Sequence, residues 1–504
     1  MNTKSIPSFV SHVTQRLQEA GFEAYLVGGC VRDLLTARVP KDWDITTNAK
    51  PEEVQAVFKD LKTVYENNFG TVTVVNIAPD RSSRLSSEAL AKEDETSKEE
   101  VQVTTYRSET GYSDNRRPDS VSYETRLEKD LERRDFTMNA IAYDPIKDTL
   151  KDIFEGIKDI KDKNIKCVLD PEIRFGEDAL RIMRAIRFST TLGFSIESAT
   201  FEAILKKADS IRNISTERAR DEFMKIIDSD APAVGIDMLQ KTGILKYIIP
   251  ELEEGIGCEQ KGAHIYDVYQ HLLHALQHSA DKGFSRAIRL SALFHDIGKP
   301  ATRRYDAKKD KYTFFGHEVV GARMTKKILD RLKVDRGTAD LVVSLVRNHM
   351  FFSDTEQITL SAVRRIISKV NPEHIWELMQ VRESDRVGMK KVEAPYRLRK
   401  YHAMIEEALR DPISVSQLAI DGTYLMEQLH MKPGPRMGWI LHALLEEVLE
   451  DPTLNTVEKL TERVKDLGEL EDKDLKILGE KAKQQKDILE GQEVEKLHQK
   501  HGVK

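Results

Sequence analysis

The first part of the chain alternates short apolar runs with polar turns, which predicts a small α/β unit. Residues 5–20 place apolar side chains at helical spacing and predict an opening amphipathic helix. Three short strands are predicted after it, at residues 23–27, 70–77 and 101–106. The polar stretch at about residues 79–100 separates the last two strands, and it predicts a surface insertion within a hairpin.

Helical periodicity replaces the strand signals from about residue 171 onward. Residues 171–227 predict several helices with a connection at 209–216, and residues 264–385 predict a further helical region rich in histidine. The expected fold class is therefore α+β: a small head with a mixed sheet and helices, followed by a long all-α body. The predicted parts are a head over residues 1–150, a helical neck over 151–250, a histidine-rich domain over 251–400 and a helical tail over 401–504.

Composition narrows the class of protein. The 504 residues are 40% hydrophobic and 32% charged, which is typical of a folded soluble protein. No apolar run approaches the roughly 20 residues that span a bilayer, and the first residues show no signal peptide. The three widely spaced cysteines form neither a disulfide framework nor a zinc motif, so we expect a cytoplasmic protein with no membrane partner.

A pair of glycines follows the first predicted strand. Residues 28–35 read GGCVRDLL, and a glycine turn between strand and helix lets the backbone approach a ligand closely. The N-terminus of the following helix favours an anion, and Arg32 could bind a phosphate through two hydrogen bonds. Taken alone, the motif is more typical of an ordinary turn.

Two aspartates follow soon after the glycines. Asp42 and Asp44 flank Trp43, and alternate side chains of an extended strand point to the same side. Two neighbouring carboxylates repel each other unless a hard cation lies between them, and Mg²⁺ in such a site binds nucleotide phosphates and activates a hydroxyl. An isolated pair more often marks a solvated acidic turn, but the preceding glycines and arginine favour the metal site.

A third motif, at residues 133–140, reads RRDFTMNA and offers two cations followed by polar groups beside an apolar anchor. From these residues alone, a capped and basic helix start is also possible. In this order, GGCVRD, DWD and RRDFTMNA resemble the bacterial-type CCA-adding tRNA nucleotidyltransferase and poly(A) polymerase family. The resemblance runs from about residue 22 to about residue 455, and it implies a polymerase-beta-like nucleotidyltransferase head.

The resemblance implies roles for individual residues. Gly29 and Arg32 would bind the incoming triphosphate, and Arg134 would contact the nucleotide. Asp42 and Asp44 would be the catalytic residues and would hold Mg²⁺. The implied reaction is template-independent addition and repair of the 3′-terminal CCA of tRNA from CTP and ATP, with release of pyrophosphate.

A polar stripe at three-residue spacing follows in the predicted neck. Asp178, Arg181, Arg184 and Arg187 would lie along one helix, where a solvated face is the simplest interpretation. The resemblance implies instead that the stripe binds the nucleotide and reads its base. A carboxylate accepts from the amine of cytosine or adenine while an arginine donates to the adjacent ring nitrogen, so Asp178 and Arg181 could accept both. Guanine and uracil would be rejected, because they present the opposite pattern.

The body carries histidines and aspartates in the order H…HD…H…H…D. This order resembles the HD phosphohydrolase domain, and imidazole and carboxylate groups suit a divalent transition metal or Mg²⁺. The implied secondary activity is phosphoester hydrolysis, for example at cyclic phosphates or damaged tRNA ends. The expected ligands are His271, His295, Asp296 and Asp385 for one metal, with His317 and His349 for a second.

Several alternatives stay open at this level. The family resemblance also fits a poly(A) polymerase, and the HD domain allows a hydrolase whose head only binds RNA. The polar loop at residues 107–122 resembles a loop that accompanies the switch from C to A addition, which favours a full CCA-adding enzyme over one that adds only CC. Superfamily members often carry a third carboxylate on a later strand, but that strand here has Gln102, so no third ligand is assigned.

The charge distribution bears on RNA binding. Of the formal net charge of −6, residues 443–504 contribute −5, with 16 acids against 11 lysines and arginines. Residues 299–336 carry +7 and residues 382–400 carry +4. Local basic surfaces of this kind could bind an RNA backbone, although solvated helix faces account for them equally well. The break at residues 433–435 and the helix predicted after it resemble the part of the family that helps to hold tRNA.

Overall fold

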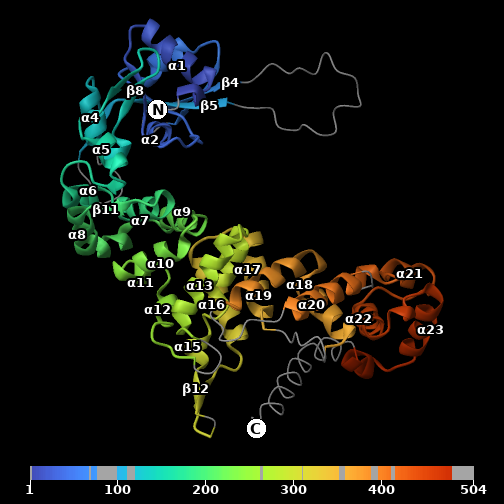
Figure 1. Cartoon of the computed structure of the whole chain (residues 1–504). Coiled ribbons are helices and arrows are strands. Elements are labelled where there is room, and N and C mark those ends of the chain that lie inside the picture. The colour runs from blue at the N-terminus through green and yellow to red at the C-terminus, as the bar shows by residue number, and fades with distance from the viewer. Residues whose placement is uncertain are drawn as a thin grey trace. The chain divides into compact units, whose positions relative to one another are not determined.

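The chain divides into two compact units, Met1–Glu253 and Glu254–Lys504. Figure 1 shows a computed structural model of the chain, coloured from the N- to the C-terminus. The residues that the structure describes are 3–66, 70–76, 99–110, 120–260, 265–308, 310–350, 358–387, 395–409 and 415–478.

A seven-stranded mixed sheet forms the core of the first unit, in the order β3-β4-β5-β2-β1-β8-β9. Strands β2 and β5 are parallel, and the other neighbouring strands are antiparallel. Apolar residues such as Leu26, Ile45 and Val103 are fully buried, because alternate strand positions face the helices. The strands are β1 (Ala24–Val27), β2 (Asp44–Thr47), β3 (Lys62–Glu66), β4 (Thr71–Asn76), β5 (Glu99–Thr105), β8 (Ala142–Asp144) and β9 (Thr149–Lys151).

Helices complete this unit. The opening helix α1 is confirmed over Ser8–Glu19 and buries Phe9, Val13 and Leu17. A separate hairpin pairs β6 (Arg107–Thr110) with β7 (Ser120–Tyr123), and β10 (Asn164–Ile165) pairs with β11 (Ser195–Ile196). The other α-helices are α2 (Gly29–Leu35), α3 (Pro51–Val57), α4 (Leu127–Glu132), α5 (Gly156–Lys161), α6 (Pro171–Glu177), α7 (Leu180–Leu192), α8 (Ser198–Lys207), α9 (Thr216–Ile227), α10 (Pro232–Lys241), α11 (Leu245–Ile248) and α12 (Pro250–Glu253).

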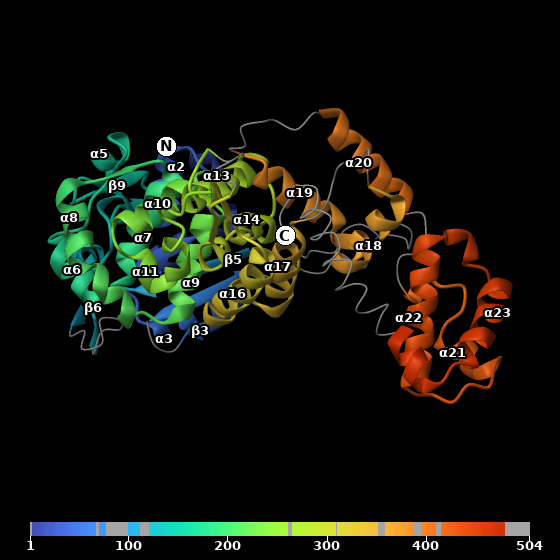
Figure 2. The same cartoon turned by 90° about the horizontal axis from the view of Figure 1, so that it is seen from below.

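The second unit consists almost entirely of helices in the part that the structure describes. In Figure 2 the orange-to-red helices α21, α22 and α23 lie together, and they share a core that includes Leu425, Leu444 and Val464. A hairpin of β12 (Arg304–Asp306) and β13 (Lys311–Thr313) interrupts the helices. The helices are α13 (Val268–Asp281), α14 (Arg286–Phe294), α15 (Lys299–Thr302), α16 (His317–Arg331), α17 (Arg336–Asn348), α18 (Leu360–Val370), α19 (Ile375–Asp385), α20 (Pro395–Ala408), α21 (Gly422–Glu427), α22 (Pro435–Glu450) and α23 (Val457–Gly468).

The structure confirms the α+β class and corrects some details of it. Strands β11, β12 and β13 lie where only helices were predicted, because strands of two or three residues are too short to show an alternating pattern. The segment 208–213, predicted as part of a connection, forms a 3₁₀ helix. Strand β5 begins at Glu99; the rest of the expected insertion at 79–100, and the middle of the loop at 107–122, lie outside the described residues.

Candidate active site and metal centre

The glycine turn after β1 passes close to a carboxylate and a guanidinium. Gly28 has φ 81° and ψ −136°, a backbone conformation that is essentially restricted to glycine. A Cβ at Gly28 would lie 3.1 Å from Arg134 Nη1 and 3.7 Å from Asp44 Oδ2. Sequence analysis assigned the binding role to Gly29, whose Cβ would instead meet Arg32 Nη2 at an ordinary 3.6 Å. The geometry therefore makes Gly28 the position at which a side chain would intrude on the site.

The two aspartates of DWD differ in environment. Asp44 begins β2 and is half-buried, while Asp42 is exposed before the strand and Trp43 is buried between them. Burial raises the pKa of Asp44; Arg134 opposes this rise and Asp42 adds to it. A half-buried carboxylate beside a second one is a donor set that fits a hard divalent cation. The parallel register of β2 and β5 places Gln102 next to Asp44, so an amide occupies this strand position.

A buried aspartate that sequence analysis missed holds Arg134 in place. Asp130 has a fully buried side chain, accepts a hydrogen bond from Thr46 Oγ1 at 3.0 Å, and pairs with Arg133 at 2.7 Å and Arg134 at 3.2 Å. Burial favours the neutral acid, but the two arginines outweigh it and hold the pKa of Asp130 below its usual value. The ionised Asp130 thus fixes Arg134 beside Asp44. The sequence carries a signal for these contacts, because Asp130 lies three residues before Arg133 and four before Arg134, the spacing at which side chains meet on a helix.

A chain of polar contacts joins α2 to the neck helix α7. Arg32 Nη1 donates to Asn139 Oδ1 at 2.9 Å, and Asn139 Nδ2 donates to Asp135 Oδ1 at 3.0 Å. Asp135 Oδ2 in turn pairs with Arg184 Nη2 at 2.6 Å. Burial opposes the charge of Asp135, but Arg184 and Asn139 hold its pKa well below the usual value. Arg32, the predicted phosphate-binding residue, is therefore oriented by a buried network that includes the ionised Asp135.

The stripe predicted to read the base differs from a single helical face. Helix α7 begins at Leu180, so Asp178 lies in the turn before it, where its Oδ1 accepts a hydrogen bond from the Leu180 N–H. Asp178 was expected on the helix itself, but it lies outside α7, as the residue that ends α6. The three arginines are buried or half-buried, which excludes a solvated face. Their carboxylate partners are Glu177 for Arg181, Asp135 for Arg184 and Glu222 for Arg187.

Both residues predicted to read the base already have internal partners. Asp178 accepts from both Nη atoms of Arg218, at 2.7 and 3.2 Å. Arg181 donates to the backbone carbonyl of Arg133 at 2.9 Å, in addition to its contact with Glu177. A donor therefore faces the carboxylate and an acceptor faces the guanidinium. These are the hydrogen-bonding roles that the edge of cytosine or adenine would take over.

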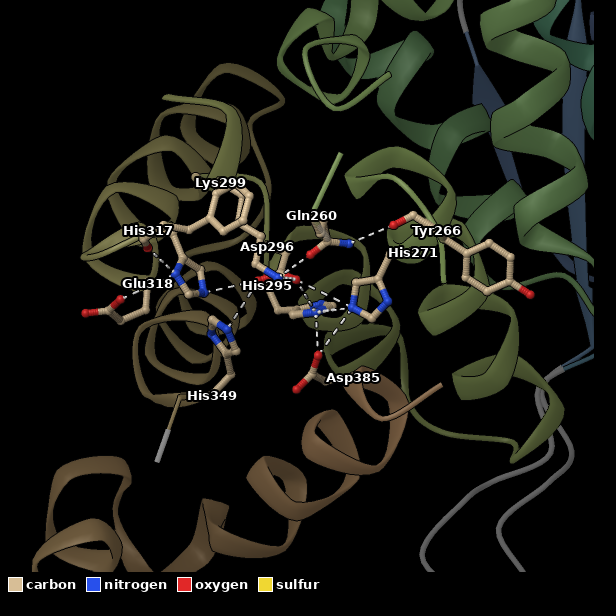
Figure 3. A network of polar contacts seen from close by, with 12 residues as sticks. Gln260, Tyr266, His271, His295, Asp296, Lys299, His317, Glu318, His349 and Asp385 are labelled. Atoms are coloured by element: carbon tan, nitrogen blue, oxygen red, sulfur yellow. Dashed lines mark hydrogen bonds and ion pairs between the residues drawn. The ribbon is translucent and has the colours of Figure 1, made fainter. Parts of the chain in front are cut away.

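Six histidines and aspartates predicted as metal ligands converge in the second unit (Figure 3). They form two groups of ligand atoms, each within 4.8 Å, and Asp296 belongs to both groups. One group is His271 (on α13), His295 and Asp296 (after α14) and Asp385 (at the end of α19); the other is Asp296, His317 (at the start of α16) and His349 (after α17).

Backbone carbonyls fix three of the rings in one tautomer. Nδ1 of His295, His317 and His349 lies 2.7–2.8 Å from the carbonyl oxygens of Ala292, Phe314 and Val346. Because a carbonyl only accepts, each Nδ1 carries a proton, so Nε2 is the ring nitrogen that is left to bind a metal. Nε2 of His317 and His349 faces Asp296 Oδ1 at 3.1 and 3.6 Å. A lone pair so close to a carboxylate is favourable only with a cation or proton between them, so the residues fit a divalent metal.

Protons and a lysine balance the negative charge of this centre. Burial disfavours a charged imidazole, but Asp296 and Asp385 outweigh it and raise the pKa of His295 to about 10. Lys299 Nζ lies 2.5 Å from Asp296 Oδ2 and 2.6 Å from Gln260 Oε1. A lysine and a protonated imidazole therefore compensate the charge of the buried carboxylates. A bound metal ion could supply this positive charge in their place.

The fold and the two sites together define a class of protein: a nucleotidyltransferase head linked to an HD domain. Comparison with known families agrees with this class. The poly A polymerase head domain matches residues 24–166, the "Probable RNA and SrmB- binding site of polymerase A" matches residues 193–256, and the HD domain matches residues 262–387.

Individual relatives are CCA-adding enzymes. The enzyme of Lactobacillus helveticus (strain DPC 4571) is 45% identical over 215 residues, which cover 42% of this chain and 48% of the relative. That of Levilactobacillus brevis (strain ATCC 367) is 36% identical over 255 residues, or 50% of this chain and 58% of the relative. The matches span about half the length of these curated relatives.

A solved structure covers more of the chain. The Bacillus stearothermophilus CCA-adding enzyme in complex with CTP has a TM-score of 0.65 and 26% identity, and covers 90% of this chain and 97% of its own. In sequence and in fold the chain is similar to the CCA-adding tRNA nucleotidyltransferase and poly(A) polymerase family. Among the described residues, no helix has both the length and the apolar character that crossing a bilayer requires.

Proposed function

We propose that this protein adds and repairs the 3′-terminal CCA of tRNA from CTP and ATP. The observation that carries the proposal is the convergence of Gly28, Asp44 and Arg134, since it unites all three head motifs at one point. Asp42 and Asp44 would hold Mg²⁺, which when bound neutralises the triphosphate and activates the attacking 3′ hydroxyl. The relatives that support the proposal include structures with CTP and with tRNA.

The residues of the head orient the nucleotide. Arg134 lies beside Asp44 and is held there by Asp130, and its Nε is buried without a hydrogen-bond partner among the described residues. Arg32 is fixed through Asn139, so both guanidiniums are preorganised for the phosphates rather than free to rotate. Positioned cations of this kind stabilise the charge that develops on the phosphates during nucleotidyl transfer.

The neck selects the base. Cytosine and adenine present an amine to Asp178 and a ring acceptor to Arg181, and can replace Arg218 and the Arg133 carbonyl as partners. Guanine and uracil present a carbonyl to the carboxylate and an N–H to the guanidinium. They would leave buried polar groups unpaired, which costs about 1–3 kcal/mol for each group. One pair of residues therefore accepts CTP and ATP and rejects GTP and UTP.

An incorporation assay tests the proposal. Transfer RNAs ending before, within and after CCA are incubated with CTP, ATP and Mg²⁺, and the products are resolved at single-nucleotide length. Addition that stops after the terminal A supports CCA addition, whereas continued addition of A identifies a poly(A) polymerase. Asp42→Asn, which removes one carboxylate charge with little change of shape, should abolish incorporation. Retained incorporation by this variant would exclude the assignment of the head.

A second activity is supported by the histidine–aspartate centre. We propose that this centre binds divalent metal and hydrolyses phosphoesters at RNA ends, because the lone pairs of its fixed imidazoles converge on Asp296. The metal would polarise the phosphate and lower the pKa of a bound water. Turnover of a 2′,3′-cyclic phosphate should require added divalent metal and disappear in Asp385→Asn. Both activities are expected in the cytoplasm, where tRNA and nucleotides are present.

A further inference from the structure

The hairpin of β12 and β13 leaves the metal centre and returns to it. Before the hairpin, Lys299 Nζ on α15 contacts Asp296 Oδ2 at 2.5 Å; directly after β13, the Phe314 carbonyl accepts from His317 Nδ1 at 2.7 Å. The turn at Gly298 packs tightly, because a Cβ there would lie 2.3 Å from the His317 carbonyl oxygen. The segments that flank the hairpin are therefore fixed at residues of the centre, so the base of the hairpin lies beside it.

The hairpin exposes aromatic rings. Tyr305 is 54% exposed and Phe315 is 49% exposed. Tyr305 and Tyr312 are directly opposite each other on the two strands, with ring centroids 5.4 Å apart. Figure 1 shows the hairpin, labelled β12, extending away from the helices of its unit.

Basic residues accompany these rings in the sequence. Residues 299–316 contain six lysines and arginines against two aspartates. Arg303 lies with its Cζ 3.7 Å from the centroid of the Tyr312 ring, and Arg304 and Lys308 are exposed. Exposed rings interleaved with cations form the surface that binds single-stranded nucleic acid, because bases stack on the rings while the cations contact the phosphates. Base-paired RNA does not offer free base faces to such rings.

We infer that this hairpin binds the single-stranded end of an RNA and presents its terminal phosphoester to the histidine–aspartate centre. The inference rests on the proposed hydrolase activity of that centre. In the hydrolysis of this phosphoester at the centre, water adds to phosphorus and one P–O ester bond breaks. The released oxygen takes a proton to become a hydroxyl, and a phosphomonoester remains, so no oxidant or further reactant is needed.

Kinetics on the full-length protein test the inference with two substrates. One is a single-stranded oligoribonucleotide with a 2′,3′-cyclic phosphate end, and the other is bis(p-nitrophenyl) phosphate, a small diester that lacks the RNA chain. The double variant Tyr305→Ala/Phe315→Ala should raise KM for the RNA about tenfold or more, since stacking on each ring is lost. Its kcat and KM for the small diester should stay unchanged. Equal KM values for the RNA in variant and wild type would overturn the inference.

A matched charge control separates the hairpin from general electrostatics. Arg304→Glu/Lys308→Glu changes the charge of the hairpin, and Lys327→Glu/Arg336→Glu makes the same change at exposed positions on α16 and α17. The first pair should raise KM for the RNA at least fivefold, and the second should alter it by less than twofold. Equal effects would show that only net charge matters, and they would overturn the inference.

Photocrosslinking tests the same surface without any turnover. An oligoribonucleotide with 4-thiouridine at its 3′ end is irradiated with the wild-type protein, and the crosslinked peptides are identified by mass spectrometry. A crosslink at Tyr305 or Phe315 supports the inference, and crosslinks confined to other segments contradict it. If wild-type protein with metal hydrolyses neither substrate, the hydrolase proposal fails, while the crosslink still decides whether the hairpin binds RNA.

Discussion

A methyl group at Gly28 should disable the head while leaving it folded. In Gly28→Ala, the added Cβ would lie 3.1 Å from Arg134 Nη1, closer than an ordinary contact, so the guanidinium must move by a few tenths of an ångström. Misplacing a catalytic group by about 1 Å can cost about 100-fold in rate, so a loss of roughly tenfold in nucleotide incorporation is expected. Tenfold corresponds to about 1.4 kcal/mol of transition-state stabilisation.

The same substitution also strains the backbone. Because φ at Gly28 is 81°, alanine there should destabilise the first unit by about 1–3 kcal/mol. For a unit of this size, each kcal/mol lowers Tm by roughly 2–4 °C. Incorporation into tRNA lacking its terminal A is therefore measured with ATP, well below the Tm determined for each variant.

Gly21→Ala provides the matched control. Gly21 also has positive φ, at 89°, but a Cβ there meets nothing within 4 Å. Both variants should lose similar stability, and only Gly28→Ala should lose incorporation. Equal incorporation by the two variants would refute the claim that close approach to Arg134 and Asp44 is what requires a glycine at residue 28.

Four further outcomes follow from the geometry. Asp178→Ala should reduce the preference for CTP and ATP over GTP and UTP in kcat/KM without changing the Mg²⁺ requirement; strict base choice in this variant would contradict the base-reading role. Asp296→Asn should lose both metal ions of the histidine–aspartate centre, measured by elemental analysis after dialysis, whereas His349→Ala should lose one; equal losses would show that Asp296 is not shared. In the Asp296→Asn background, Gln102→Glu should tighten Mn²⁺ binding severalfold in calorimetry, because a carboxylate would then lie beside Asp44. Burial raises the pKa of Cys30 to about 11, so this thiol should react with a disulfide reagent at pH 8 only after denaturation; rapid reaction of the native protein would show that it is accessible.

Motif order in the sequence was enough to predict the class of the fold and to select candidate site residues, several of which the structure brings together. The glycine pair, the DWD aspartates and the RRDFTMNA segment lie far apart in the chain, yet the structure brings Gly28, Asp44 and Arg134 together. The six predicted ligands of the second centre also converge. Their convergence was predictable because several residues of specific chemistry, in a fixed order and at fixed spacing, rarely occur together by chance.

Predictions from local spacing were incomplete where contacts distant in sequence determine the environment of a side chain. The stripe from Asp178 to Arg187 was compatible with a solvated face, but its partners Asp135, Arg218 and Glu222 lie 35–49 residues away in sequence. A pairing over such a distance leaves no periodic signal. The short hairpin at residues 304–313 was also missed, because three residues per strand carry no readable alternation.

The sequence by itself determined which chemical groups the protein has and the order in which they occur. Local physics then sets the glycine turn, the β-branched strands and the amphipathic helices, all of which depend on neighbours within a few residues. Only the tertiary structure decided which glycine faces the site, which tautomers the histidines adopt and which carboxylates stay ionised. Each of these depends on burial and on partners distant in the chain, since a carbonyl such as that of Phe314 or an ion pair such as Asp130–Arg134 acts only once the fold has placed it.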